Sequence, residues 1–536
     1  MFDTNARDPS RTGIHSRSVV SVLLVAAFSI IYFVEVCIRA SEKRFWFDEL
    51  CTLYICRLPT FEASWQAVLH GADYNPPFFY LVMRTARNLF GEGLIAFRIP
   101  AIVGFWILCL CLFCFVHRRA GTLPAFCAMV LPILSGAYYY AYDARPHGII
   151  LGLCGLAVLF WQLASDRLVD LRATRLSARL WELAFSATLA AAFLTHCYGV
   201  VLVVPFACAE LVRTVRSRRL NWSMWMAMIA PAIVATALLL PLLRAYRQTI
   251  GGTGFGEAYF HADLGQLAPF YVNLLSPCTL VLLFAAILFV LDHLGLWNKV
   301  ERSRGERPGV TLEEVALTMG FVFLPIFGIA VGRIINGPFV PRYFLSALCG
   351  FCLMLGWSTA YRFRPNRVAL IVSLVLAGLI CKHLLGLLSR HLHEVGESLT
   401  EPSTSETLNT APGDPLRTQS LLISGAANSL PIVVANGHDF LYLFNYAPSL
   451  APRVYSVSWD MRALKYRLDH ALRVWCHLDF NRERTFDEFL PSNPHFLLYG
   501  TQAFLVDIPR LMERGGAIRT LKFGSDHFLA EIEMRR

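Results

Sequence analysis

The chain carries little charge for its length. Only 16% of its 536 residues are Asp, Glu, Lys or Arg, whereas 56% are hydrophobic. Soluble domains usually contain about 25% charged residues, so this composition excludes an ordinary soluble protein. The long apolar runs instead indicate a protein that crosses the membrane many times. The net charge of +10 does not by itself indicate a nucleic-acid partner, because basic residues also mark membrane topology.

Several motifs of ligand-binding proteins are missing. The 15 cysteines form no metal-spaced Cys/His array, and most lie in apolar runs as small hydrophobic residues. Cys51 and Cys56 are the best-placed pair for a disulfide, although we expect both thiols to be free. The glycine-rich stretch 251–256 lacks the Gly-Lys-Ser/Thr ending of a Walker loop, and we interpret the loop 244–267 as a mobile lid.

Apolar runs of membrane-spanning length predict about eleven spans. The first run follows three arginines, is longer than a typical signal-peptide core and lacks an A-x-A site, so we expect it to stay uncleaved. Basic residues fall in every second loop, as the positive-inside rule requires. The N-terminus is therefore placed in the cytoplasm and the tail after His391 outside. The predicted spans are 19–39, 94–116, 122–141, 146–165, 181–196, 198–213, 222–243, 268–292, 312–333, 343–361 and 367–389.

Two further apolar segments, 61–70 and 76–90, lie between the first and second spans. We expect both to be helices in the membrane interface, because counting the second as a span would put the later basic loops outside. The tail is predicted to be a small α/β domain, with strands at 431–435, 495–500 and 527–533 and helices at 439–446 and 502–514. The predicted domains are a membrane domain at 1–392, a Ser/Thr/Pro-rich linker at 393–417 and an exoplasmic domain at 418–536.

The first outward loop carries adjacent acids, Asp48 and Glu49. Carboxylates at a membrane surface are costly unless they are solvated, paired or bound to metal, and two acids on a wet loop are the simplest explanation. Flanking interfacial helices and the rigid Asn75-Pro76-Pro77 turn favour a built site instead.

Arginines also gather on the outer face, where the positive-inside rule should deplete them. Arg98, Arg145 and Arg342 stand at span ends, close to Asp143, Tyr343 and His196 in the outward loops. Arg binds phosphate well because its planar fork gives two parallel donors. Any one of these arginines is explained equally by lipid headgroups or by the acids, but the set favours an anionic ligand. For His196, a helix-end hydrogen bond is the simplest role, and a ligand or proton relay is the alternative.

One reaction uses a carboxylate base, cations that stabilise a leaving phosphate and a membrane setting together. It is glycosyl transfer from a lipid-linked phosphosugar. The sequence resembles the bacterial branch of the protein O-mannosyltransferase group, which includes the lipid A aminoarabinose transferases and rhizobial galacturonosyltransferases of the GT-C superfamily. The resemblance spans residues 15–390. It is carried, in order, by Phe47-Asp48-Glu49, Asn75-Pro76-Pro77-Phe78-Phe79-Tyr80, Leu89-Phe90-Gly91, Phe97-Arg98-Ile99-Pro100, Tyr142-Asp143-Ala144-Arg145-Pro146, Thr195-His196-Cys197-Tyr198 and Pro341-Arg342-Tyr343-Phe344.

The resemblance implies an all-α membrane fold of the GT-C type in a bacterial inner membrane. It also implies a polyprenyl-phosphate sugar donor, an exoplasmic active site and an inverting displacement onto an envelope glycolipid, polysaccharide or protein. Carried over by position, Asp48 is the catalytic base and Glu49 supports it. Arg145 contacts the donor phosphate, and Arg342 and Tyr343 line the donor pocket. The other expected donor-binding residues are Asp143, Arg98, Asn75 and His196.

The sequence departs from the family pattern at three positions. Asn75 stands where the family usually has His, Asp143 where it often has Glu, and His147 where it often has Tyr. Asn75 does not titrate near neutral pH, so a role that needs an imidazole is in doubt. Some relatives bind a divalent metal, Mg or Mn, near the acids, and the sequence leaves open whether Asp48 or Glu49 holds one. A transporter or flippase, a non-catalytic envelope scaffold and an inactive relative stay as alternatives.

Overall fold

The structure of the chain is a computed structural model that describes residues 9–169, 175–251, 262–293, 309–334, 339–360, 367–400, 429–435, 437–447, 450–459, 472, 474, 476–477, 483–524 and 527–535. Residues 252–261 of the expected lid and 401–417 of the expected linker lie outside these residues. The chain divides into two compact units, and each is described by itself. The first comprises Met1–Ala40, Arg98–Leu239 and Glu257–Thr400, and the second comprises Ser41–Phe97, Leu240–Gly256 and Glu401–Arg536.

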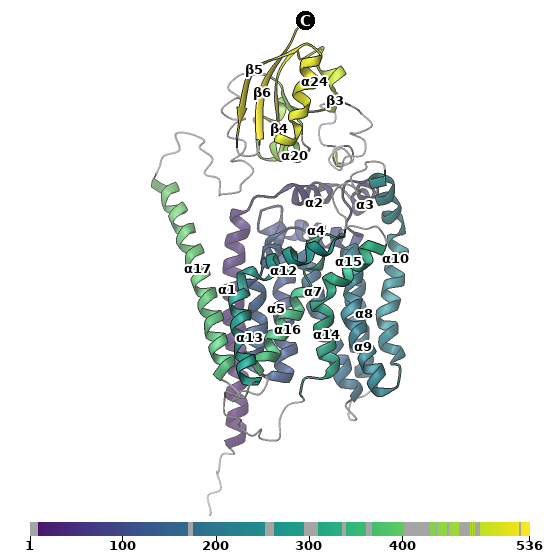
Figure 1. Cartoon of the computed structure of the whole chain (residues 1–536), viewed down its shortest axis with the longest axis vertical. Coiled ribbons are helices and arrows are strands. Elements are labelled where there is room, and N and C mark those ends of the chain that lie inside the picture. The colour runs from purple at the N-terminus through teal and green to yellow at the C-terminus, as the bar shows by residue number, and fades with distance from the viewer. Residues whose placement is uncertain are drawn as a thin grey trace, which may run out of the picture. The chain divides into compact units, whose positions relative to one another are not determined.

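The first unit is built from apolar helices around one large hydrophobic core (Figure 1). Short 3₁₀ segments interrupt or join these helices at η1 (Ala96–Arg98), η2 (Leu131–Leu134), η3 (Gly136–Tyr142), η4 (Cys197–Leu202), η5 (Leu264–Gln266), η6 (Ser276–Cys278) and η7 (Pro341–Phe344). The α-helices are α1 (Pro9–Glu42), α5 (Ile99–Ala120), α6 (Thr122–Val130), α7 (Pro146–Val169), α8 (Arg175–Thr195), α9 (Val203–Ser217), α10 (Trp222–Gly251), α12 (Leu267–Leu275), α13 (Thr279–His293), α14 (Leu312–Val322), α15 (Leu324–Ile334), α16 (Ala347–Ala360) and α17 (Arg367–Thr400).

The multi-span architecture is confirmed, but the count of eleven spans is not. Among the described residues, seven helices are long and apolar enough to cross a membrane, or up to nine if each of two bent helix pairs is one span. The bent pairs fall at the predicted spans 122–141 and 312–333. The predicted spans 181–196 and 343–361 correspond to α8 and α16, and neither is among the candidates. Helix α16 has 14 residues, fewer than the roughly 20 that a perpendicular span needs.

Helices α5 and α7 pack with their backbones in contact. A Cβ built on Gly104 would lie 2.5 Å from the carbonyl oxygen of Gly148, and one on Gly152 would lie 2.4 Å from the carbonyl oxygen of Gly104. Membrane helices use small residues in this way, because lipid provides no hydrophobic force that presses helices together. The packing fixes the position of the N-terminal end of α7, which begins at Pro146.

The second unit contains three short helices and a mixed sheet. The helices are α2 (Phe47–Arg57), α3 (Phe61–Leu69) and α4 (Pro77–Phe90), so both segments that were expected to be interfacial helices are helical. The acid pair lies in the first turn of α2. The sheet has the order β3-β2-β1-β4-β6-β5. Strands β3, β2, β1 and β4 are parallel to one another, whereas β6 pairs antiparallel with both β4 and β5.

Helices cover both faces of this sheet. Helix α20 (Gly437–Tyr446) packs on one face, while α23 (Phe486–Phe489) and α24 (Asp507–Glu513) pack on the other. The three predicted strands are confirmed as β1 (Ile432–Val434), β4 (His495–Thr501) and β6 (His527–Met534). The sequence analysis missed three more strands, which are short or lie at an edge of the sheet. These are β2 (Val454–Ser458), β3 (Glu483–Thr485) and β5 (Gly516–Phe523).

Candidate active site

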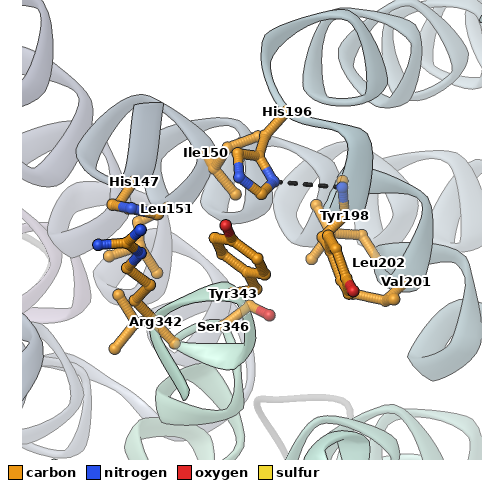
Figure 2. A pocket seen from close by; sticks show the side chains of 12 residues that line it. His147, Ile150, Leu151, His196, Tyr198, Val201, Leu202, Arg342, Tyr343 and Ser346 are labelled. Carbon is orange, nitrogen blue, oxygen red and sulfur yellow. Dashed lines mark hydrogen bonds between the residues drawn. The ribbon is translucent and has the colours of Figure 1, made fainter. Parts of the chain in front are cut away.

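Three segments that are far apart in the sequence line one pocket in the first unit. His147 lies at the start of α7. His196 immediately precedes η4, and Tyr198 lies within it. Arg342 and Tyr343 lie in η7 (Figure 2). The pocket encloses about 340 Å³ of empty space, open solvent included. The rest of its lining is Ile150, Leu151, Gly199, Val201, Leu202, Leu345 and Ser346. The fold therefore brings the predicted residues His196, Arg342 and Tyr343 together.

Aromatic and imidazole rings form the polar part of this pocket. The ring centroid of Tyr343 lies 4.5 Å from that of His196 and 4.6 Å from that of Tyr198. His147 lies 5.7 Å from His196 and 6.0 Å from Tyr343 by the same measure. Figure 2 shows the Tyr343 hydroxyl directed toward His196 and the Arg342 guanidinium beside His147. Such a lining offers hydrogen-bond donors to an anion and flat ring faces to a bound ligand.

The local structure around His196 sets the orientation of its ring. The side chain caps η4, because its Nδ1 accepts a hydrogen bond from the backbone N–H of Tyr198 at 3.2 Å. This is the helix-end hydrogen bond that the sequence favoured. In the neutral imidazole the proton therefore sits on Nε2. The same ring packs on Tyr343, so one residue both ends a helix and lines the pocket.

Asp143 and Arg145 are buried between η3 and α7, next to the pocket but not among its lining residues. The backbone N–H of Arg145 donates to the carbonyl oxygen of Asp143 at 2.7 Å, which closes a tight turn before Pro146. Arg145 precedes His147 by two positions in the chain, and Figure 2 shows the Arg342 side chain beside His147. Two of the three predicted donor-binding arginines thus lie close to one histidine.

Arg98 is fully buried, and its guanidinium reaches the backbone of α1. Its Nη1 donates to the carbonyl oxygen of Ala40 at 2.7 Å. Carbonyls in the last turn of a helix lack partners within the helix, so this contact satisfies one of them. Arg98 does not line the pocket of the first unit.

In the second unit, the two predicted catalytic acids have different surroundings. Glu49 is fully buried, and its Oε2 lies 3.3 Å from the backbone N–H of Trp46, which donates to it, and 3.6 Å from the ammonium of Lys43. Asp48 is only partly buried. Both lie in the first turn of α2, where the helix dipole stabilises negative charge.

Asn75 lies in a small polar network whose centre is Asp73. The Asp73 Oδ2 accepts hydrogen bonds from the Asn75 side-chain amide at 2.9 Å and from the Tyr80 hydroxyl at 2.7 Å, while Oδ1 accepts from the backbone N–H of Tyr74 at 2.8 Å. All three side chains, Asp73, Asn75 and Tyr80, are buried. The Asn-Pro-Pro-x-x-Tyr element therefore places two donors around one carboxylate.

The sequence analysis did not select His147, Tyr198 or Ser346 as site residues, although all three line the pocket. His147 could have been selected from the sequence, because it is ionisable and follows a proline at the start of a predicted span. The sequence also gave no weight to Glu35, which is fully buried on α1. Its Oε1 lies 3.1 Å from the Arg39 Nε and 3.3 Å from the Nε2 of His383 on α17.

Metal and thiol chemistry find little support among the described residues. No group of three His, Cys, Asp or Glu side chains in that part of the chain is arranged to hold a metal ion. Cys51 and Cys56 are both buried and neither is in a disulfide, and burial raises the pKa of the Cys56 thiol well above its usual value.

No protein-family model matches the chain, and no curated protein matches it by sequence. Solved structures do match it. The crystal structure of ArnT from Cupriavidus metallidurans in the apo state matches with a TM-score of 0.55 and 13% identity, covering 96% of this chain and 98% of that one. The crystal structure of ArnT from Cupriavidus metallidurans bound to undecaprenyl phosphate matches with a TM-score of 0.51 and 12% identity, covering 95% and 97%. The chain has the ArnT fold.

The likeness to ArnT supports the expected fold. The ArnT fold confirms an apolar multi-span bundle that carries a small C-terminal sheet domain. The match covers nearly the whole chain, including the C-terminal domain beyond residue 390, where the sequence resemblance ended. At 12–13% identity it concerns the fold alone.

Proposed function

We propose that this chain is an integral-membrane glycosyltransferase that uses a polyprenyl-phosphate-linked sugar as its donor. The sugar moves to a hydroxyl of an envelope glycolipid, polysaccharide or protein on the exoplasmic face of a bacterial inner membrane, with inversion at the anomeric carbon. The observation that carries the proposal is the ArnT fold over 96% of the chain, since one ArnT structure is bound to undecaprenyl phosphate. The basic loops support a cytoplasmic N-terminus and an exoplasmic C-terminal domain.

The pocket of the first unit supports an anionic donor. Arg342 is one of its lining residues, no carboxylate lines it in the part of the chain that the structure describes, and Arg145 lies two positions before His147. A guanidinium binds phosphate oxygens through two parallel N–H donors, which a lysine cannot reproduce. Arg342 and Arg145 are therefore proposed to bind the donor phosphate, while Tyr343, which packs on His196, is proposed to present its ring to the sugar.

The two acids are proposed to have different roles, Asp48 in proton transfer and Glu49 in holding the local structure. Asp48 takes the proton from the acceptor hydroxyl as its oxygen attacks the anomeric carbon, and the bond from that carbon to the phosphate oxygen breaks. The electron pair leaves with the polyprenyl phosphate, whose charge the arginines stabilise. Glu49 stays with Lys43 and the Trp46 N–H, and this arrangement holds the first turn of α2 in shape.

The proposal is tested with labelled polyprenyl-phosphate sugars supplied to membranes that lack any other copy of the protein. Wild type should transfer label to a non-donor molecule, whose identity names the acceptor. Asp48→Asn should lower the rate by at least 100-fold, because general-base catalysis typically contributes about 10²–10⁴-fold. Asp487→Asn is a matched control, since this exposed acid on α23 pairs with Arg514 and lies outside the pocket. Transfer that is equal in wild type and Asp48→Asn would remove Asp48 as the base.

The same assay separates the alternatives. A transporter or flippase would move a labelled lipid across sealed vesicles without forming a new glycosidic bond. A scaffold or an inactive relative would do neither, and neutral substitutions of Asp48 and Arg342 would then have no effect. An Arg342→Lys variant should raise the donor KM, whereas Arg333→Ala should not, because Arg333 is half-exposed and paired with Asp263.

A further inference from the structure

The C-terminal domain contacts the helix that carries the acid pair, and both lie in the second unit. The hydroxyl of Tyr446, at the end of α20, accepts a hydrogen bond from the backbone N–H of Phe45 at 2.8 Å. The neighbouring Asn445 accepts a hydrogen bond through its Oδ1 from the Tyr54 hydroxyl at 3.0 Å. At the other end of α20, the His438 ring lies 3.9 Å from the Phe47 ring, centroid to centroid. Both ends of α20 therefore touch the N-terminal part of the chain.

These contacts bracket the acids. Phe47 immediately precedes Asp48 and Phe45 lies three positions before it. Both are buried, and Tyr54 follows Asp48 on α2. The contact at Tyr54 fixes the body of α2, while the contact at Phe45 fixes the backbone that leads into its first turn. The orientation of the first turn, and with it that of the Asp48 side chain, thus depends on α20.

Helix α20 is itself fixed to the sheet. Phe440 and Leu443 are buried against one face, together with Val434 of β1 and Leu497 of β4. Well-packed side chains transmit strain and resist displacement, so α20 presents Asn445 and Tyr446 from a rigid base. The sheet domain is therefore a mechanical support for the first turn of α2.

We propose that the C-terminal domain is a positioning domain for the catalytic base, acting through Asn445 and Tyr446. The inference rests on the proposed function, in which Asp48 removes the acceptor proton. Proton transfer needs donor and acceptor within hydrogen-bond reach, and small misplacements of a reacting group carry large losses in rate. Neither Asn445 nor Tyr446 touches the reacting atoms in this scheme. Asn445 acts through Tyr54 of α2, and Tyr446 acts through the backbone that leads into α2.

The test compares Tyr446→Phe and Asn445→Ala with a matched control, Tyr455→Phe. Tyr455 lies on β2 and packs on Phe489 at the opposite face of the sheet, so its hydroxyl is lost without touching α20. Amide hydrogen exchange over 44–50 should speed up about two- to tenfold in both test variants and stay unchanged in the control, as expected for the loss of one hydrogen bond. The value of kcat should fall by a similar or larger factor, with the donor KM unchanged.

A background variant shows whether the effect passes through the acid. In Asp48→Asn the residual transfer should not fall further when Tyr446→Phe is added, because there is no longer a base to position. An equal fall in both backgrounds would overturn the inference, as would unchanged exchange over 44–50 in both test variants. If wild type transfers no sugar, the proposed glycosyltransferase function fails, while the exchange measurement still decides whether α20 holds α2.

Discussion

The network around Asp73 gives a sharp prediction about the Asn-Pro-Pro-x-x-Tyr element. Its Oδ2 accepts two side-chain hydrogen bonds, from Asn75 and Tyr80, and Oδ1 accepts one from the Tyr74 backbone. Hydrogen bonds donated to both carboxylate oxygens suit an ionised carboxylate. We infer that the element exists to keep this buried carboxylate satisfied. Removing one donor should then cost stability, whether or not the residue ever meets a substrate.

The magnitude follows from the burial of the network. A hydrogen bond to a charged group contributes about 1.5–3 kcal/mol, and here the loss falls on a buried acceptor. A cooperative unit of about 150–250 residues shifts its Tm by roughly 2–4 °C per kcal/mol. Tyr80→Phe, which removes only the hydroxyl at 2.7 Å, should therefore lower the Tm by roughly 3–12 °C. Asn75→Ala should have an effect of the same order.

The measurement is thermal unfolding of the purified protein in detergent, with Tyr455→Phe as the control for loss of a hydroxyl. Asn75→His is the decisive variant, because an imidazole N–H can also donate to Asp73 and the related family usually has His at this position. It should recover most of the stability that Asn75→Ala loses. A Tyr80→Phe variant that is no less stable than Tyr455→Phe would refute the reasoning. So would an Asn75→His variant that is no better than Asn75→Ala.

Two further predictions concern other parts of the structure. Glu92 accepts hydrogen bonds from Arg57 and Arg87. These bonds, chiefly the one from Arg57, hold the pKa of Glu92 below its usual value. The stability that ionised Glu92 contributes is therefore present above about pH 4.3 and is lost as the pH falls through the lowered pKa. Glu92→Gln should therefore lower the Tm at pH 7 by the equivalent of about 0.2–1 kcal/mol per exposed pair, and the difference from wild type should vanish in acid. Gly152→Ala should separate α5 from α7, because the added Cβ would lie 2.4 Å from the Gly104 carbonyl oxygen. We expect a lower yield of folded protein in size-exclusion chromatography. A yield equal to that of wild type would contradict this prediction.

The amino-acid sequence alone determined the class of the protein and the residues worth inspecting. Hydropathy and basic loops suffice for a multi-span bundle, since the bilayer imposes both length and charge bias on each segment locally. Strong local patterns likewise gave β1, β4 and β6. The edge strand β5 was missed because it is mostly exposed and is held by long-range pairing with β6, which leaves little hydrophobic signal in its own sequence.

Only the tertiary structure decided which of the candidate residues meet. The pocket joins His147, His196 and Arg342 because three helix ends pack together, and no local pattern encodes that packing. The same holds for Arg98, whose burial against Ala40 gives it a structural partner that its position in the sequence does not reveal. The contact of Tyr446 with Phe45 joins residues about 400 positions apart and depends on how α20 is held by the sheet. Sequence fixes what each segment prefers locally, whereas long-range packing selects which segments share a site.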